Sequence, residues 1–275
     1  MTNKLHTCIW FDGTAQAAAA AYCALIPGSK ILHDNGMVVT FELNGRKIMG
    51  LNGGPLFQVN PSISFTLVCN TVAATNAAWD ALAEGGSVLI GIDKYPWSER
   101  YGWLKDKFGV TWQITVGPDD HTVTPSMLFV GERFGQAADA IALYSSLFQN
   151  ASTQVMVKYP EGDPSAGKVM YSSFSLDGHP LIAMDGPGQH AYSFNEAVSF
   201  VVECKDQEEI DFFWNKLTED GAESQCGWLK DKFGVSWQII PADLGKWTSD
   251  PERAPRVMAA LMKMKKLDIA TLASA

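Results

Sequence analysis

The sequence predicts an α+β fold made of two tandem βαβββ-type modules, with mixed curled sheets and outer helices. The string GWLKDKFGVTWQI at residues 102–114 returns as GWLKDKFGVSWQI at 227–239, and the two differ only at Thr111 and Ser236. A repeat this long indicates two domains or half-domains rather than a solenoid of short repeats. Upstream matches keep one constant spacing and pair Cys69 with Cys204, Trp79 with Trp214, and Leu82 with Leu217.

Each copy is expected to contain two successive βαβββ units. A first strand rich in β-forming residues precedes an alanine-rich helix, at about 15–26 and again at 135–148. The dipeptides Asn44-Gly45 and Asp177-Gly178 permit positive φ and predict hairpin turns. The expected strands are Leu5 to Phe11, Val38 to Leu43, Lys47 to Leu51 and Ile63 to Cys69, then Met127 to Val130, Val169 to Leu176, Leu181 to Met184 and Ala197 to Cys204.

The chain divides into a first module over residues 1–117, a second over 124–242 and a helical tail over 249–275, with the polar string GPDDHTV as linker. The tail opens on Ser249-Asp250-Pro251-Glu252, which has a capping side chain, an early proline and an early acid, as helix starts do. A second short helix is expected after Asp268. The tail is expected to pack against the body or to form a homodimer contact, rather than to lie on a membrane.

Composition limits the partners. The formal net charge of -9 and the pI near 5.0 oppose binding to a nucleic acid backbone, so no nucleic acid partner is expected. No signal peptide is expected from the first residues, and no apolar run is long enough to span a bilayer, so no membrane partner is expected. Its five cysteines are odd in number and lack Cys-x-x-Cys spacing. These features predict a cytoplasmic protein with reduced thiols.

Three strings carry a resemblance to a known family: WFDG at Trp10, PWSERYGW from Pro96, and the FGVSWQI ending. With the paired βαβββ units they resemble the vicinal oxygen chelate superfamily of glyoxalases, dioxygenases and bleomycin-resistance proteins. The closest resemblance is to its PhnB-like branch, often labelled demethylubiquinone methyltransferase, and it covers about residues 4–241. That label gains nothing from the residues, because no glycine-rich strand-to-helix turn for a methyl donor is present.

The resemblance implies a cavity formed by paired modules, where the metal-dependent members hold a divalent ion through His and Glu side chains. His6 stands where the first-strand ligand of the superfamily lies, and alternation places His6, Cys8 and Trp10 on one face of their strand. Gln113 and Gln238 stand where relatives place a metal-binding Glu, and an amide oxygen is a weaker ligand for a hard cation. A divalent metal at His6 and a structural, hydrogen-bonded His6 therefore both stay open.

The copies differ most just before the repeated string, where the first inserts KYPWSERY and the second passes almost directly to Cys226. The inserted Trp97, Glu99, Arg100 and Tyr101 are expected either to cap a ligand cavity or to form a solvated loop. His179 lies in a predicted turn and is expected to be exposed.

Two hypotheses for function follow. The first is an enzyme of lyase, isomerase or dioxygenase type acting on a small oxygenated or aromatic metabolite, with His6, Glu99 and Gln113 as catalytic residues. The second is a metal-free protein that binds or sequesters a small molecule, as the resistance members of the superfamily do. The expected ligand-binding residues are Trp10, Cys8, Trp97, Arg100, Tyr101 and Gln238.

Overall fold

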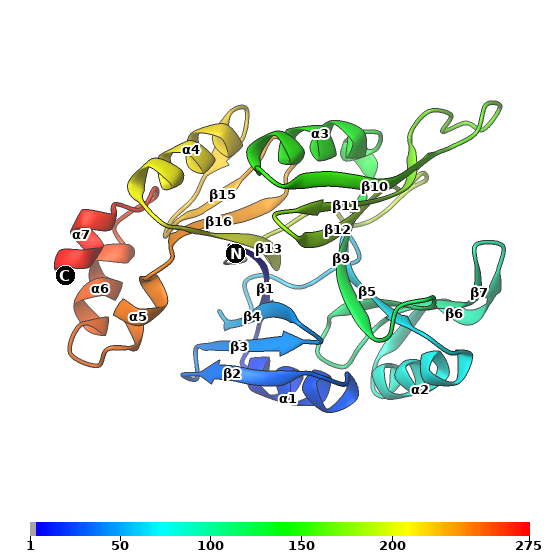
Figure 1. The fold of residues 1–275 in the computed structure, drawn as a ribbon, viewed down its shortest axis with the longest axis horizontal. Coiled ribbons are helices and arrows are strands. Elements are labelled where there is room, and N and C mark those ends of the chain that lie inside the picture. The colour runs from blue at the N-terminus through cyan, green and yellow to red at the C-terminus, as the bar shows by residue number, and fades with distance from the viewer. Residues whose placement is uncertain (1–3) are drawn as a thin grey trace.

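The computed structural model describes residues 4–275, which form two mixed eight-stranded sheets (Figure 1). The predicted α+β class is confirmed. The chain is organised as four βαβββ units, two in each copy. The first copy supplies β1 Leu5–Phe11, α1 Ala15–Leu25, β2 Lys30–Asp34, β3 Val38–Leu43 and β4 Arg46–Asn52, then β5 Ile63–Cys69, α2 Val72–Ala83, β6 Ser87–Tyr95, β7 Ser98–Lys105 and β8 Thr111–Val116.

The second copy follows the same order and is followed by the tail. Its first unit is β9 Thr122–Phe129, the 3-10 turn η1 Gly131–Arg133, α3 Ala137–Leu147, β10 Ala151–Lys158, β11 Val169–Leu176 and β12 His179–Asp185. Its second unit is β13 Val198–Cys204, α4 Gln207–Thr218, β14 Ala222–Glu223, β15 Trp228–Lys230 and β16 Ser236–Pro241. The tail helices are α5 Leu244–Ser249, α6 Ala254–Leu261 and α7 Ile269–Ser274.

Neither sheet belongs to one copy. Sheet A has the order β14-β15-β16-β13-β1-β4-β3-β2, and sheet B has the order β10-β11-β12-β9-β5-β8-β7-β6. The two copies join at antiparallel pairs: β1 meets β13 with Cys8 opposite Ser199, and β5 meets β9 with Ser64 opposite Ser126. Each sheet therefore takes one unit from each copy, and the strands of one copy are shared between both sheets.

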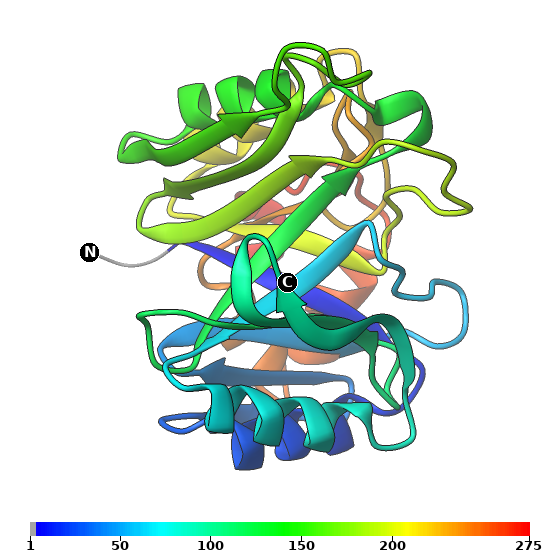
Figure 2. The same cartoon turned by 90° about the vertical axis from the view of Figure 1, so that its right-hand side faces the viewer.

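The buried apolar residues form one cluster, and within each copy core side chains meet between its two half-sheets. Figures 1 and 2 show α1 beside α2 at one end of the molecule and α3 beside α4 at the other. Tyr22 of α1 packs against Phe41 of sheet A and Trp112 of sheet B, with ring centroids 6.4 and 5.1 Å away. Tyr144 of α3 packs in the same way on Trp237, at 5.1 Å. α1 and α3 thus hold together the two half-sheets that their own copy contributes to sheets A and B.

The repeated string supplies a buried carboxylate to this core in each copy. The buried Asp106 carboxylate accepts hydrogen bonds from the Tyr22 hydroxyl at 2.6 Å and the Trp112 indole at 2.9 Å, and from two backbone amides of its own turn. Asp231 repeats this with the Tyr144 hydroxyl at 2.7 Å and an indole at 2.9 Å. Burial raises the pKa of both carboxyl groups, against the lowering effect of these donors. The string is therefore a folding signature.

The predicted strands and helices are confirmed, and the elements for which no range was predicted include β2, β6, β10, β14 and α5. β2 and β10 are exposed along nearly their whole length, so they lack the alternation of apolar and polar residues that marks a strand. The tail begins with α5, which was not predicted. The Asp250 carboxylate caps a turn by accepting from the Glu252 amide, and α6 begins only at Ala254. α7 follows the capping residue Asp268 as predicted.

The tail packs against the last unit of its own chain. The amides of Cys226 and Gly227 donate to the carbonyls of Met264 and Lys265, at 2.7 and 2.8 Å, and Leu267 is fully buried beside Gly227. Packing against the body was one of the two predicted alternatives, and a homodimer contact through the tail stays a prediction. No helix formed by residues 4–275 is both long and apolar enough to cross a bilayer.

Candidate functional site

The face of each sheet that points away from the core is here called its outer face. On β1, Leu5, Ile9 and Phe11 belong to the core, so the alternating His6, Cys8 and Trp10 lie on the outer face of sheet A. This agrees with the predicted shared face. The middle of both outer faces is buried and polar, with Ser199 and Gln238 on sheet A and Ser64, Gln113 and Ser126 on sheet B.

The structure separates the predicted site residues into two groups. His6, Cys8, Trp10 and Gln238 lie on sheet A, whereas Trp97, Glu99, Arg100, Tyr101 and Gln113 belong to the hairpin β6–β7 and to β8 of sheet B. His6 and Gln113 are therefore not brought together. The reason is that each sheet combines one unit from each copy. β1 pairs with β13 of the second copy in sheet A, whereas β8 pairs with β5 in sheet B.

The centre of sheet B is a chain of uncharged hydrogen bonds. The Gln113 amide donates to the Ser64 hydroxyl at 2.7 Å, and the Tyr101 hydroxyl donates to the Gln113 carbonyl at 2.9 Å. Beside them the hydroxyls of Thr66 and Ser126 are 2.6 Å apart. Burial raises the pKa of Tyr101, so its phenol remains a protonated donor at neutral pH. These groups can bind neutral oxygen and nitrogen groups of a ligand.

An aromatic cluster lies next to this chain, at the end of the hairpin β6–β7. Trp97 stacks on Tyr95 with ring centroids 5.0 Å apart, and both meet Tyr101 edge to face at 5.8 Å. Trp97 is 66% exposed although it is one of the largest apolar side chains of the protein. A large exposed aromatic beside a polar centre is typical of a binding surface.

Two other residues of the insertion are directed elsewhere. The Arg100 guanidinium donates to the side-chain oxygen of Asn76 on α2 at 2.6 Å, so it fastens the hairpin to the helix rather than facing Gln113. Glu99 is exposed on β7. Neither residue takes part in the hydrogen-bond chain around Gln113.

The corresponding centre of sheet A has the same glutamine–serine bond and is packed against aromatic rings. The Gln238 amide donates to the Ser199 hydroxyl at 3.0 Å, and Trp10 is held by Phe57 and Trp228, at 5.1 and 6.1 Å between rings. The Trp10 indole donates to a backbone carbonyl at 2.7 Å. Burial raises the pKa of Cys8 to about 12, so its thiol is not a nucleophile at neutral pH.

The surroundings of His6 do not fit a divalent metal. The nearest acid is Glu203, whose carboxylate oxygen lies 3.9 Å from the His6 ring nitrogen and 2.6 Å from the Lys47 ammonium. Within residues 4–275 no group of three His, Cys, Asp or Glu side chains is placed to hold a metal ion. Burial lowers the pKa of His6, and the charge of Lys47 lowers it further. A metal at His6 stays a prediction, and no chemistry is derived from it.

His179 was predicted to be exposed, and that prediction is wrong, because only 2% of it is exposed. Its turn docks against the first copy, where the Arg46 guanidinium donates to the carbonyl of Gly178 at 3.3 Å. Burial lowers the pKa of His179 to about 3, and the charge of Arg46 adds to this. The sequence contained one signal of this docking: His179 follows the turn Asp177-Gly178 just as Arg46 follows the matched turn Asn44-Gly45.

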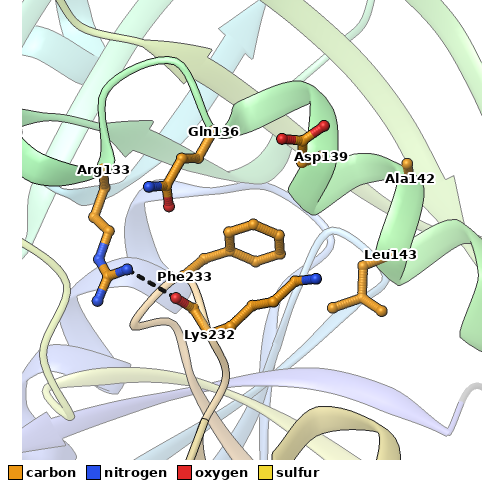
Figure 3. A pocket seen from close by; sticks show the side chains of 7 residues that line it. All are labelled: Arg133, Gln136, Asp139, Ala142, Leu143, Lys232 and Phe233. Atoms are coloured by element: carbon orange, nitrogen blue, oxygen red, sulfur yellow. Dashed lines mark hydrogen bonds between the residues drawn. The ribbon is translucent and has the colours of Figure 1, made fainter. Parts of the chain in front are cut away.

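Two hollows of the surface lie away from both outer faces. The larger, of about 560 Å³, lies where α3 meets the turn between β15 and β16 (Figure 3). The smaller, of about 280 Å³, lies between α1 and α2 above Phe108. Neither hollow could be predicted from the sequence, because each is formed by helices and turns that are distant along the chain.

The comparison with protein families agrees with the two-copy fold. A family model described as 3-demethylubiquinone-9 3-methyltransferase matches residues 3–115 and again residues 121–240. The two matches cover far more than half of the chain, so the chain belongs to this family, with its domain present twice. The predicted PhnB-like membership is thereby confirmed. No curated protein was found to match the chain.

Solved structures include relatives of two kinds. The putative 3-demethylubiquinone-9 3-methyltransferase, PhnB protein, of Bacillus cereus is 31% identical, and the match covers 41% of this chain and 98% of that one with a TM-score of 0.39. Glyoxalase I of Zea mays is 9% identical, and the match covers 90% of this chain and 95% of that one with a TM-score of 0.57. The second likeness confirms the glyoxalase-like fold.

Proposed function

We propose that this protein binds or sequesters a small, neutral aromatic molecule that carries a hydroxyl or carbonyl group, without the help of a metal. The observation that carries the proposal is the chain from Tyr101 through Gln113 to Ser64, next to the exposed ring of Trp97. The ligand lies on the outer face of sheet B, between the aromatic cluster and the polar centre.

The chemistry of the lining groups supports this ligand class. An amide, a phenol and aliphatic hydroxyls donate and accept hydrogen bonds without carrying charge, so they suit a neutral partner better than an ion. The aromatic cluster of Tyr95, Trp97 and Tyr101 offers ring faces and edges for stacking. A ligand hydroxyl takes the place of the Tyr101 hydroxyl as donor to the Gln113 carbonyl, or a ligand carbonyl accepts a hydrogen bond from the Tyr101 hydroxyl. The ligand ring packs against Trp97.

The proposal is tested by titrating the protein with a panel of phenols and aromatic ketones and following tryptophan fluorescence and the midpoint of thermal unfolding. A ligand that binds the native state raises that midpoint. Gln113→Leu is expected to weaken binding about tenfold or more, since a buried polar contact is lost. Gln238→Leu is the matched control, because Gln238 holds the same bond to a serine on the other sheet.

Trp97→Ala locates the ligand independently. It is expected to weaken binding and to remove the fluorescence response, while leaving the fold intact because the side chain is mostly exposed. If no member of the panel binds, or if Gln113→Leu and Gln238→Leu weaken binding equally, the outer face of sheet B is not the site.

Enzymatic alternatives have less support from the geometry. Lyase, isomerase or dioxygenase chemistry that uses His6, Glu99 and Gln113 together requires one substrate to reach both sheets. The family name describes methyl transfer, but within residues 4–275 neither sheet has the doubly wound parallel order that usually holds a methyl donor. We therefore propose binding rather than catalysis. The five free cysteines support a cytoplasmic location as part of this proposal.

A further inference from the structure

The larger hollow, here called the α3 hollow, has the features of a second ligand site. Figure 3 shows Arg133 at one end, Leu143 at the other and the ring of Phe233 between them. Ala142 and Leu143 add apolar surface from α3. The hollow therefore combines an apolar floor with charged groups at its rim, as small-molecule sites do.

The charged groups of the α3 hollow have one positive charge in excess. Arg133 and Lys232 are cationic and Asp139 is anionic, and none of the three forms an ion pair with any residue in 4–275. The Arg133 guanidinium is held in place by donating to the carbonyl of Lys232 at 2.8 Å. The Lys232 ammonium lies 5.4 Å from the centre of the Phe233 ring. Both cations are thus available beside an aromatic wall.

The first copy lacks this set of charges. Its Lys107 and Phe108 repeat Lys232 and Phe233, including an ammonium 5.5 Å from the ring. However, α1 has alanines along the corresponding face, and only residues 12–14 separate β1 from α1, whereas 130–136 separate β9 from α3. The longer connection forms η1 and carries Arg133. The hollow above Phe108 in the first copy therefore has Lys107 but no counterpart of Arg133 or Asp139. The charged lining is a feature of the second copy, and the repeated fold does not require it.

We propose that the α3 hollow binds a small organic monoanion, a carboxylate with an apolar body. The planar guanidinium of Arg133 suits a carboxylate, the Lys232 ammonium adds a second charged donor, and the ligand body packs on Phe233 and Leu143. Asp139 disfavours a more highly charged ligand such as phosphate, since it repels every added negative charge. This site is separate from the outer face of sheet B and does not depend on the function proposed there.

The test is a calorimetric titration with three probes: benzoate as the monoanion, benzyl alcohol as its neutral counterpart, and inorganic phosphate. Benzoate is expected to bind at least about tenfold more tightly than the other two, because it alone combines one charge with a ring. Benzoate is also titrated into the Gln113→Leu variant, so that binding on sheet B is distinguished from binding in the hollow.

Lys232→Gln is expected to weaken benzoate binding about fivefold to tenfold, and Lys107→Gln, its counterpart in the first copy, to leave it unchanged. Asp139→Asn is expected to strengthen benzoate binding and to admit phosphate. Arg133→Gln is a further variant, but its bond to the Lys232 backbone also supports the turn, so the exposed Lys232 decides the outcome. Equal binding of benzoate and benzyl alcohol, or equal effects of Lys232→Gln and Lys107→Gln, would overturn the proposal.

Discussion

The two copies close the edge beside their repeated string in different ways. In the first copy the start of the string forms the end of β7, in the long hairpin β6–β7 that carries the aromatic cluster. In the second copy β14 and β15 are short, and backbone carbonyls of the tail accept the amides of Cys226 and Gly227. An exposed strand edge has unpaired amides and carbonyls that must find partners. The comparison shows that the partner can come from either a hairpin or a distant segment.

The first glycine of the repeated string, Gly102 or Gly227, has different neighbours in the two copies. A methyl group at Gly102 would clash with the ring of Trp79, whereas one at Gly227 would meet the backbone oxygen of Ile239 at 2.7 Å and Leu267 at 3.1 Å. Gly227 also has a φ of +85°, which favours glycine. The same residue is therefore required by a side chain in one copy and by the backbone in the other.

The largest expected effect comes from replacing these glycines. Gly227→Ala should lower the free energy of unfolding by about 4 kcal/mol, combining a left-handed backbone with a clash, and Gly102→Ala by about 3 kcal/mol from the clash alone. Chemical denaturation measures both. In a Trp79→Leu background the Gly102→Ala penalty should fall by more than about 1 kcal/mol, whereas Leu267→Ala should not relieve Gly227→Ala. Relief in both copies would show that the two glycines are alike after all.

The next largest effect is expected from truncating Leu267, the tail side chain that packs beside Gly227 of the second copy. Leu267→Ala should destabilise the protein by about 3 kcal/mol, since Leu267 is fully buried between the tail and the second copy. Leu56→Ala is the control, because Leu56 is 73% exposed and should change the free energy of unfolding by less than about 0.5 kcal/mol. A loss below about 1 kcal/mol for Leu267→Ala would mean that the tail is only loosely attached.

A third difference between the copies is sensitive to pH. Arg46 and His179 follow matched turns, and the buried His179 has its pKa lowered from 6.5 to about 3, chiefly by burial and then by the charge of Arg46. Since the unfolded chain binds the proton more tightly, stability is full above pH 6.5 and is lost as the pH falls below it. The loss between pH 7 and pH 5 should be about 2 kcal/mol for this group.

His179→Gln should remove that part of the pH dependence, and denaturation curves at several pH values measure it. The exposed His33 provides the control variant, His33→Gln. If stability is as steep in pH for His179→Gln as for the unaltered protein, His179 is not responsible, and the buried His6 is the next group to replace.

The smallest effect is expected at the end of the hairpin. Trp97→Ala should change the free energy of unfolding by less than about 1 kcal/mol, because the side chain is mostly exposed and packs on the rings of Tyr95 and Tyr101 at the surface. Thermal unfolding without ligand measures this. A larger loss would indicate that the hairpin, like the tail, serves mainly to close its sheet.

Much of this fold follows from local patterns in the sequence. The β-forming residues of Leu5–Phe11 and the turn at Asn44-Gly45 predict a strand and a hairpin whatever their neighbours are. The repeated string predicts two equal closing strands for the same reason. β2 and β10 could not be found in this way, because both faces of an exposed edge strand are free to be polar or apolar.

The pairing of distant segments could not be predicted from those patterns. β1 has the same alternation whether its neighbour is β5 of its own copy or β13 of the other, so the placement of His6 and Gln113 on different sheets is not visible in the sequence. For the same reason an Asp-Gly turn predicted an exposed His179, which docking against Arg46 buries. Candidate residues could be identified one by one, but not grouped into sites.

Because each sheet takes one unit from each copy within a single chain, the sequences of the two copies can diverge in a particular way. Two identical separate copies joined by a twofold axis would present the same outer face twice, and every substitution would appear on both. Residues 117–121 connect the copies in one chain, so their association is intramolecular and does not depend on protein concentration. Symmetry is no longer imposed, and each face can change alone. One retains an aromatic hairpin beside Gln113, while the edge of the other has become the attachment point of the tail.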